Sequence, residues 1–210
     1  MEVLEFGNKA SKIVLIQPMD VGDLESAEHE CSLIAKKTGV DLLLRVFGVE
    51  NWNRDLSPWK APAVFGNEGF GDGAEETLTE ILKTCKDRSK RYYIGGYSLA
   101  GLFALWSAYR TEIFCGVAAA SPSVWFPGFA EYMKQNEIKC ECIYLSLGDK
   151  EAKTRNPVMS TVAEKIREAY ALLKARNRRC ILEWNEGNHF KDVEIRTANA
   201  FSWLLYDGLL

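Results

Sequence analysis

Short apolar runs alternate with amphipathic stretches along nearly the whole chain. The apolar runs predict strands at 2–6, 12–17, 41–46, 91–94, 116–120, 142–147 and 180–184. The run at 12–17 holds Ile13-Val14-Leu15-Ile16, a pattern typical of a strand that is buried on both faces. Pro18 is expected to end this strand, and the alternating run at 2–6 is expected at an edge of the sheet.

Between these runs, apolar residues recur at the spacing of an amphipathic helix. One helix is expected to begin at a cap on Asp23 and to end at Gly39, and another follows Asp72, which forms a capping box with Glu75. Further helices are predicted at 99–110, at 131–135, from the pair Asn156-Pro157 onward, and at 193–205.

This order of strands and helices predicts an α/β fold with a mostly parallel central sheet and helices on both faces. A chain of 210 residues is long enough for one domain with a sizeable core and too short for two. We therefore expect a single domain over residues 1–210.

One stretch combines a strand, a tight turn and a helix. Gly96-Tyr97-Ser98-Leu99-Ala100 lies between the strand at 91–94 and the helix at 99–110. A serine at such a turn is typical of a nucleophile elbow, which needs small residues two places before and after the serine. Gly96 and Ala100 meet that need, so Ser98 is the candidate nucleophile. The alternative is a glycine-rich turn that only packs an ordinary α/β domain.

A serine hydroxyl needs a base in contact with it and an acid behind the base. Of the two histidines, His29 lies on the polar side of its helix, whereas His189 follows the last predicted strand and is the candidate base. The acid should follow the strand at 142–147, where Glu151 is favoured and Asp149 is the alternative. The order serine, acid, histidine is that of the α/β-hydrolases.

The backbone N–H groups of Leu99 and Met19 are the expected oxyanion donors, because Pro18 has no N–H to offer. The long segment 48–72 is too aromatic for a disordered loop and could wall a pocket. Candidate pocket residues are Trp52, Trp59, Trp125 and Phe126, each of which could equally belong to the core.

Together these motifs resemble the esterase branch of the α/β-hydrolases that includes siderophore (enterobactin-type) esterases and S-formylglutathione hydrolase. The resemblance covers most of the chain. It rests on Gly96 to Gly101, Arg54-Asp55-Leu56-Ser57-Pro58, Ala120-Ser121-Pro122-Ser123-Val124-Trp125, Gly148 to Glu151, and Gly187-Asn188-His189-Phe190.

The resemblance implies an α/β-hydrolase fold, a small-molecule ester substrate and no cofactor or metal. It also implies that Arg54 and Asp55 support the active-site loop as an ion pair. Two features depart from the family: Ala100 replaces the usual second glycine of the elbow, and the chain has no room for the insertions of some siderophore esterases. The second departure favours a small or generic ester.

The expected function is therefore that of a serine esterase. An acyltransferase or thioesterase with the same triad, and a non-catalytic binding protein of this fold, remain alternatives.

Composition and charge narrow the choice of partner. The net charge is −3, which gives no electrostatic case for nucleic acid or for an anionic membrane. No apolar run approaches the length of a membrane helix, and the acidic start of the chain lacks the features of a signal peptide. Six scattered cysteines are expected to stay reduced, Cys140 and Cys142 being too close together for a usual metal pair. We expect a cytoplasmic protein, and the sequence leaves a homo-oligomer open.

Overall fold

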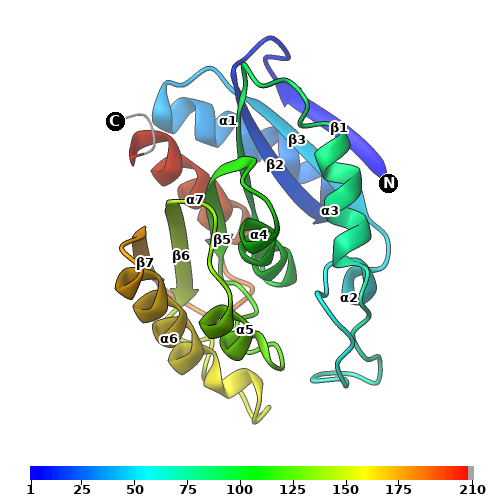
Figure 1. Ribbon diagram of the computed structural model, residues 1–210, viewed down its shortest axis with the longest axis vertical. Coiled ribbons are helices and arrows are strands. Elements are labelled where there is room, and N and C mark those ends of the chain that lie inside the picture. Colours follow the sequence, from blue (N-terminus) through cyan, green and yellow to red (C-terminus); the bar gives the residue numbers. More distant parts are fainter. Residues whose placement is uncertain (208–210) are drawn as a thin grey trace.

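The computed structural model describes residues 1–207, with the side chains of residues 1–206. The elements in chain order are β1 (Glu2–Gly7), β2 (Ile13–Asp20), η1 (Val21–Ser26), α1 (Ala27–Thr38), β3 (Leu43–Val49), α2 (Trp52–Asp55), α3 (Ala74–Lys83), β4 (Arg91–Tyr97), α4 (Leu99–Arg110), β5 (Phe114–Ala120), α5 (Phe129–Gln135), β6 (Cys142–Gly148), η2 (Met159–Thr161), α6 (Val162–Ala175), β7 (Arg179–Asn185) and α7 (Val193–Asp207). Figure 1 shows their arrangement around the sheet.

The strands form one sheet in the order β1-β3-β2-β4-β5-β6-β7. Among the strands of residues 1–207, only β1, at the edge, runs antiparallel to its neighbour, so the prediction of a mostly parallel sheet is confirmed. Parallel strands need crossover connections, and these connections are the helices that cover the two faces. The carboxyl ends of β2, β4, β5, β6 and β7 therefore meet at one edge of the sheet, where loops are placed to form a site.

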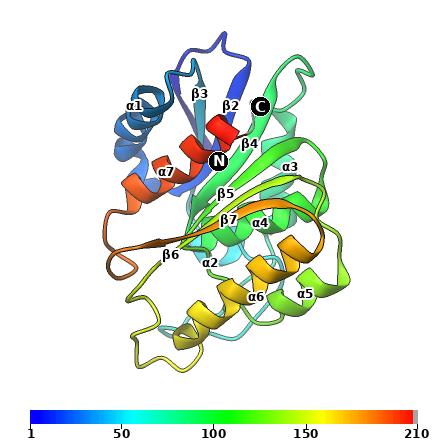
Figure 2. The same cartoon turned by 90° about the vertical axis from the view of Figure 1, so that its left-hand side faces the viewer.

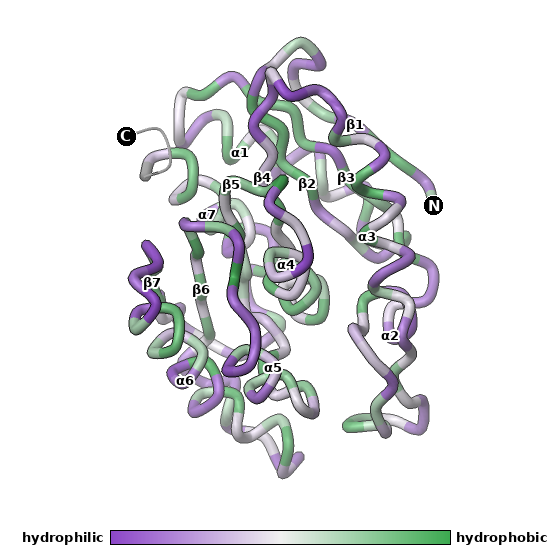
Figure 3. The backbone as a smooth tube through the Cα atoms, in the orientation of Figure 1, coloured by the Kyte–Doolittle hydropathy of each residue, from purple (hydrophilic) through white to green (hydrophobic). Residues whose placement is uncertain are grey.

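The helices form two layers. One face of the sheet packs against α1 and α7, while α3, α4, α5 and α6 contribute to the core on the other face. Figure 2 shows α1 and α7 on the opposite side of the sheet from α4 and α6. Hydrophobic colour runs along β2 and β3 in Figure 3, as expected for strands that are covered on both sides.

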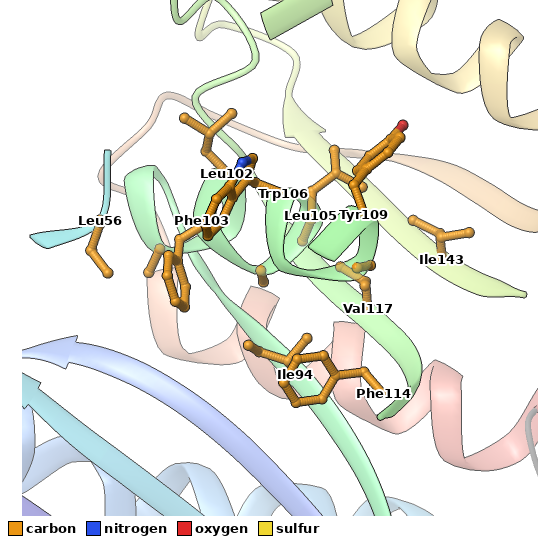
Figure 4. Packing of buried hydrophobic residues seen from close by; sticks show 14 of the residues in the cluster. Leu56, Ile94, Leu102, Phe103, Leu105, Trp106, Tyr109, Phe114, Val117 and Ile143 are labelled. Carbon is orange, nitrogen blue, oxygen red and sulfur yellow. The ribbon is translucent and has the colours of Figure 1, made fainter. Parts of the chain in front are cut away.

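Helix α4 lies in the middle of the larger core. Every residue from Leu99 to Tyr109 is buried, so this helix is apolar all round rather than amphipathic. Figure 4 shows its side chains against Ile94 of β4 and Val117 of β5. A fully buried helix is held in place on all sides, and its N-terminus is therefore a rigid support for the serine that precedes it.

The expected end of the second strand is wrong. Strand β2 does not end before Pro18 but continues to Asp20. It pairs with β4 only as far as Ile16 and with β3 as far as Asp20, so Pro18 lies where the strand has a neighbour on one side only. Proline is tolerated at such an edge position.

Two further errors concern helix caps. Asp20, not Asp23, caps the 3₁₀ segment by accepting a hydrogen bond from the Gly22 N–H at 2.9 Å, and α1 begins later. The capping box at Asp72 is absent from the described structure, because Gly73 is the N-cap of α3 and makes no side-chain cap. Its N–H donates to the carbonyl of Arg54 at 2.9 Å, so the backbone of α2 takes the place of the predicted cap.

The helix expected from Asn156-Pro157 begins only at Val162, after the short segment η2. Asn156 nevertheless stabilises the turn before η2, because its side-chain oxygen accepts hydrogen bonds from the N–H groups of Val158 and Met159 at 3.0 and 3.1 Å. The end of α1 at Gly39 is confirmed, with the glycine in the left-handed conformation at φ 67°.

Gly95 tests how closely α7 must approach the sheet. A Cβ at this position would lie 2.5 Å from the Phe201 ring and 2.7 Å from the Ala118 Cβ. We expect Gly95→Ala to lower the free energy of unfolding by about 1–3 kcal/mol, the usual cost of overpacking a core. Urea unfolding measures this, with the exposed Gly22→Ala as a control that should change stability by less than about 0.5 kcal/mol. Equal stability of both variants would contradict the close packing of α7.

Candidate active site

The serine turn between β4 and α4 has the backbone of a nucleophile elbow. Ser98 has φ 57° and ψ −120°, a conformation that side-chain-bearing residues rarely adopt. A Cβ on Gly96 would lie 2.7 Å from the Ala100 Cβ, so position 96 must be glycine if position 100 is alanine. Close contact across the turn therefore explains why the motif needs small residues at positions 96 and 100.

Two backbone hydrogen bonds hold this turn against the neighbouring strand. The Ser98 N–H donates to the Ala120 carbonyl at 3.1 Å, and the Ser123 N–H donates to the Ser98 carbonyl at 3.0 Å. Both partners come from the end of β5 and the turn after it. Because both polar groups of the Ser98 backbone are satisfied there, the strained conformation is stabilised from outside the turn.

His189 and Glu151 lie next to Ser98 in a continuous line of contacts. The His189 Nε2 is 3.0 Å from the Ser98 Oγ, and the His189 Nδ1 is 2.7 Å from the Glu151 Oε2. The three residues come from the loops after β4, β6 and β7, which meet at the carboxyl edge of the sheet. With a carboxylate on one nitrogen, an imidazole presents its other nitrogen as a base toward a hydroxyl.

The two candidate acids have different partners. Glu151 contacts the imidazole, whereas the Asp149 carboxylate accepts a hydrogen bond from the Gly187 N–H at 2.7 Å. The Lys150 N–H also donates to the Gly187 carbonyl at 3.0 Å. Asp149 therefore fixes the loop that carries His189, and Glu151 fixes the imidazole itself.

Sequence reasoning missed Arg196, which lies behind Glu151. The Arg196 side chain is 2% exposed, and its Nη1 donates to the Glu151 Oε1 at 3.1 Å and to the Tyr97 Oη at 2.9 Å. Its Nη2 donates to the Glu186 carbonyl at 3.0 Å. The sequence does carry a signal for this residue. Arg196 precedes Ala200 and Leu204 at the i,i+4 and i,i+8 spacings of one helix face, and both of those residues are buried, so Arg196 lies on the inward face of α7.

The remaining contacts of Glu151 also come from groups that the sequence analysis did not single out as site residues. Its Oε1 accepts hydrogen bonds from the Ser121 hydroxyl at 2.7 Å and from the Gly148 N–H at 2.6 Å. Tyr97 donates its hydroxyl to the His189 carbonyl at 2.8 Å, and burial raises the pKa of this phenol. The carboxylate and the histidine backbone are thus held by separate donors.

Beside Ser98 lies a largely apolar hollow of about 340 Å³. Its apolar walls are Phe65, Trp125, Met159, Val162 and Phe190. Of the predicted pocket residues, Trp125 lies in this wall, and Trp52 lines a neighbouring hollow.

Trp59 and Phe126 were also predicted pocket residues, but neither lines the hollow beside Ser98. Their rings pack together at 5.7 Å, and Trp59 donates its N–H to the Pro127 carbonyl at 2.9 Å. Phe126 is fully buried, so its apolar surface is used for core packing.

The two expected oxyanion donors occupy different kinds of backbone. Leu99 is the first residue of α4, where a backbone N–H has no partner within the helix. Met19 lies inside β2 opposite Gly48 rather than in a loop after the strand. That part of β2 extends beyond its pairing with β4, toward the same edge of the sheet as the elbow.

The other expected features have simple positions. His29 is exposed and lies 2.8 Å from Glu194 on α7, away from Ser98's line of contacts. Arg54 and Asp55 form an ion pair of 2.6 Å in which the arginine is largely exposed. Within residues 1–207, no group of three metal-binding side chains comes together, and no helix is long and apolar enough to cross a bilayer.

No protein-family model matches the chain, and no curated protein matches its sequence. Solved structures do match. The siderophore hydrolase EstA from Aspergillus nidulans has a TM-score of 0.71 at 19% identity, over 97% of this chain and 88% of EstA. An IroE-like serine hydrolase from Shewanella oneidensis has a TM-score of 0.74 at 14% identity, over 98% of this chain and 75% of that protein.

The enterobactin esterase FES from Shigella flexneri is similar with a TM-score of 0.63 at 16% identity. It matches over 99% of this chain, which spans only 55% of the length of that esterase. At these identities the likeness shows the fold alone, an α/β fold that this chain shares with the hydrolases and the esterase named here. Substrate and reaction have to be argued from the residues of this chain.

The buried pair of Arg196 and Glu151 gives a stability test. Arg196→Met leaves a buried carboxylate without its charged partner, so we expect it to lower the free energy of unfolding by about 3–5 kcal/mol. Urea unfolding of Lys83→Met is the control, because the Lys83–Glu80 pair is more than half exposed and is worth less than about 1 kcal/mol. A loss as small as the control's would mean that Arg196 does not hold Glu151.

Proposed function

We propose that this protein is a serine esterase that hydrolyses a small carboxylic ester. The observation that carries the proposal is the line from Ser98 Oγ through His189 to Glu151, with contacts of 3.0 and 2.7 Å. The shared fold of a siderophore hydrolase and an enterobactin esterase supports it from outside the chain. Ser98 itself lies at a strained turn, which is the usual position of the reactive serine in a nucleophile elbow.

In the first half of the reaction, the Ser98 oxygen attacks the acyl carbon and its proton passes to the His189 Nε2. The negative charge that develops on the carbonyl oxygen is stabilised by the Leu99 N–H at the N-terminus of α4 and by the Met19 N–H. The C–O bond to the alcohol then breaks, and the proton on Nε2 moves to the leaving alkoxide. An acyl group remains on Ser98.

In the second half, water takes the place of the alcohol. His189 removes a proton from the water, the resulting hydroxide attacks the acyl carbon, and the proton returns to the Ser98 oxygen as the acid leaves. Glu151 keeps the proton of His189 on Nδ1 throughout, so that Nε2 alone exchanges protons with the reacting atoms. The reaction is balanced by one water molecule per ester.

The shape of the apolar hollow supports a short apolar group on one side of the ester. A volume of about 340 Å³ lies at the small end of ligand pockets, and its walls are Phe65, Trp125, Met159 and Val162. These side chains can cover an alkyl or small aryl group, and they offer no charged partner. We therefore propose a small ester as substrate.

We also propose a cytoplasmic location. Free thiols at Cys31, Cys85, Cys115, Cys140 and Cys180 support it, because a reducing compartment keeps cysteines in that form. Burial raises the pKa of Cys85 to about 11 and that of Cys140 to about 12, so these thiols are unreactive at neutral pH.

Hydrolysis of p-nitrophenyl acetate and butyrate tests the nucleophile and the base. We expect Ser98→Ala and His189→Ala each to lower kcat by at least about 10³-fold, because each removes a member of one catalytic unit. His29→Ala is the matched control and should retain wild-type turnover, since His29 is exposed and contacts Glu194 instead. Wild-type turnover in both Ser98→Ala and His189→Ala would remove the assignment.

The two acids need a separate comparison. Glu151→Gln should lower kcat by about 10²- to 10⁴-fold, because the amide cannot stabilise the protonated imidazole as a carboxylate does. Asp149→Asn should cost less than about tenfold, since the amide oxygen can still accept the hydrogen bond from the Gly187 N–H. The reverse order of damage in steady-state kinetics would make Asp149 the acid.

A further inference from the structure

A second hollow, of about 480 Å³, opens at the same edge of the sheet. It lies between the end of β2, the segment η1 with the start of α1, and the start of α7. Phe190 lines both this hollow and the apolar hollow beside Ser98. Tyr97, the residue before Ser98 in the chain, also lines the second hollow. The two hollows are therefore neighbours on either side of Phe190.

The second hollow, which we call the acidic hollow, is lined by five carboxylic acids: Asp20, Asp23, Glu30, Asp192 and Glu194. Among its lining residues in the described part of the chain there is no lysine, arginine or histidine. Just outside the lining, His29 lies 2.8 Å from the Glu194 carboxylate, and the buried Arg196 donates to the Tyr97 hydroxyl at 2.9 Å. Walls of one sign focus the electric field in a concave surface, and here that field attracts cations.

The floor of the acidic hollow provides an independent observation. Glu30 is 1% exposed and Gln17 is 3% exposed, and the Gln17 Nε2 donates to the Glu30 Oε2 at 3.1 Å. The other oxygen of each side chain, Gln17 Oε1 and Glu30 Oε1, accepts no hydrogen bond from the described residues. Buried acceptors without donors are unfavourable, so these two oxygens, on residues that line the hollow, favour a ligand that donates hydrogen bonds.

We propose that the acidic hollow binds a primary ammonium group carried by the substrate. An ammonium is compact, carries the sign that the walls attract, and offers three N–H donors to the unpartnered oxygens of Gln17 and Glu30. This inference rests on the proposed esterase function, and it makes the preferred substrate an amino ester. Its ester carbonyl lies at Ser98 and its ammonium lies beyond Phe190.

The protonation of Glu30 supplies a further consequence. Burial raises the pKa of Glu30 to about 8, the negative Glu194 contributes in the same direction, and the hydrogen bond from Gln17 opposes both. Below pH 8, without a ligand, this carboxyl therefore keeps its proton, and it can accept from an ammonium with both oxygens only after that proton has left. Asp20, Asp23 and Asp192 also line the hollow. His29 is not among the lining residues, but it contacts Glu194, which is.

A bound ammonium favours the ionised carboxylate of Glu30 and lowers its pKa. Binding at pH 7 should therefore release a proton, and affinity should rise with pH until about 8, where Glu30 is ionised without the ligand. The ammonium itself stays charged over this range, since its pKa is about 10.

Binding can be measured without hydrolysis. We would titrate Ser98→Ala protein with pentylammonium chloride and with 1-pentanol by calorimetry at pH 7 and pH 8, in two buffers of different ionisation enthalpy. We expect pentylammonium to bind at least about tenfold more tightly than pentanol, as for a charge-assisted hydrogen bond, and to release a proton at pH 7. Adding Glu30→Gln should abolish both the preference and the proton release.

Glu28→Gln is the matched control for Glu30→Gln. It lies on the same helix, is exposed, and does not line the hollow, so it should keep the preference and the proton release. Circular dichroism verifies that each variant is folded. Equal binding of pentylammonium and pentanol to the Ser98→Ala protein would overturn the proposal, and so would an ammonium preference that survives Glu30→Gln.

Hydrolysis then connects the acidic hollow to the reaction. Two matched pairs place the ammonium on either side of the ester: ethyl 6-aminohexanoate with ethyl heptanoate, and 6-aminohexyl acetate with heptyl acetate. We expect wild type to favour the ammonium ester at least about tenfold in kcat/KM in one pair, and Glu30→Gln to lose that ratio.

The two levels of the account fail differently. Hydrolysis of all four esters without an ammonium preference overturns the amino ester and leaves the esterase standing. Tight, proton-releasing binding of pentylammonium with no hydrolysis of any ester supports the ammonium site and overturns the esterase.

Discussion

The backbone of Ser98 is the constraint on which the rest of the structure depends. A residue at φ 57° costs about 1–3 kcal/mol and persists only where its surroundings hold it. Here the surroundings are the absence of a side chain at Gly96, two hydrogen bonds to the β5 turn, and the fully buried helix α4. This single turn points a hydroxyl out of the sheet edge and leaves the first N–H of α4 beside it.

The loops after β6 and β7 have to reach the serine, and contacts between these two loops hold them together. Asp149 fastens the histidine loop by its backbone, while Glu151 fastens the imidazole. Arg196 contacts Glu151 and Tyr97 together, so the final helix is linked to both the acid and the residue before the serine. Arg196 gives the buried Glu151 a partner of opposite charge, and removing that partner would leave a buried charge uncompensated.

Most of the local architecture could be predicted from the sequence, because strand runs, helix spacing and the small residues of the elbow are short-range patterns. Errors arose where contacts with residues distant in the sequence determine the end or the cap of an element. Pro18 stays in β2 because its strand has a neighbour on one side only, and α3 is capped by the carbonyl of Arg54 rather than by Asp72. The sequence left Trp59 and Phe126 open between pocket wall and core, and their mutual packing, with Phe126 buried and Trp59 half-buried against the core, depends on contacts between distant segments. Arg196 was missed because its meaning depends on Glu151, 45 residues away in the chain.

The central claim is that the strained turn presents Ser98 to His189 as a reactive nucleophile. The most direct measurement is the rate at which a fluorophosphonate labels the protein, followed by mass spectrometry of the labelled peptide, in wild type and in His189→Ala. The account predicts rapid labelling at Ser98 in wild type and a rate at least about 10³-fold lower in the variant, because the hydroxyl is unreactive without its base. Labelling at another residue, or equal rates in the two proteins, would contradict it.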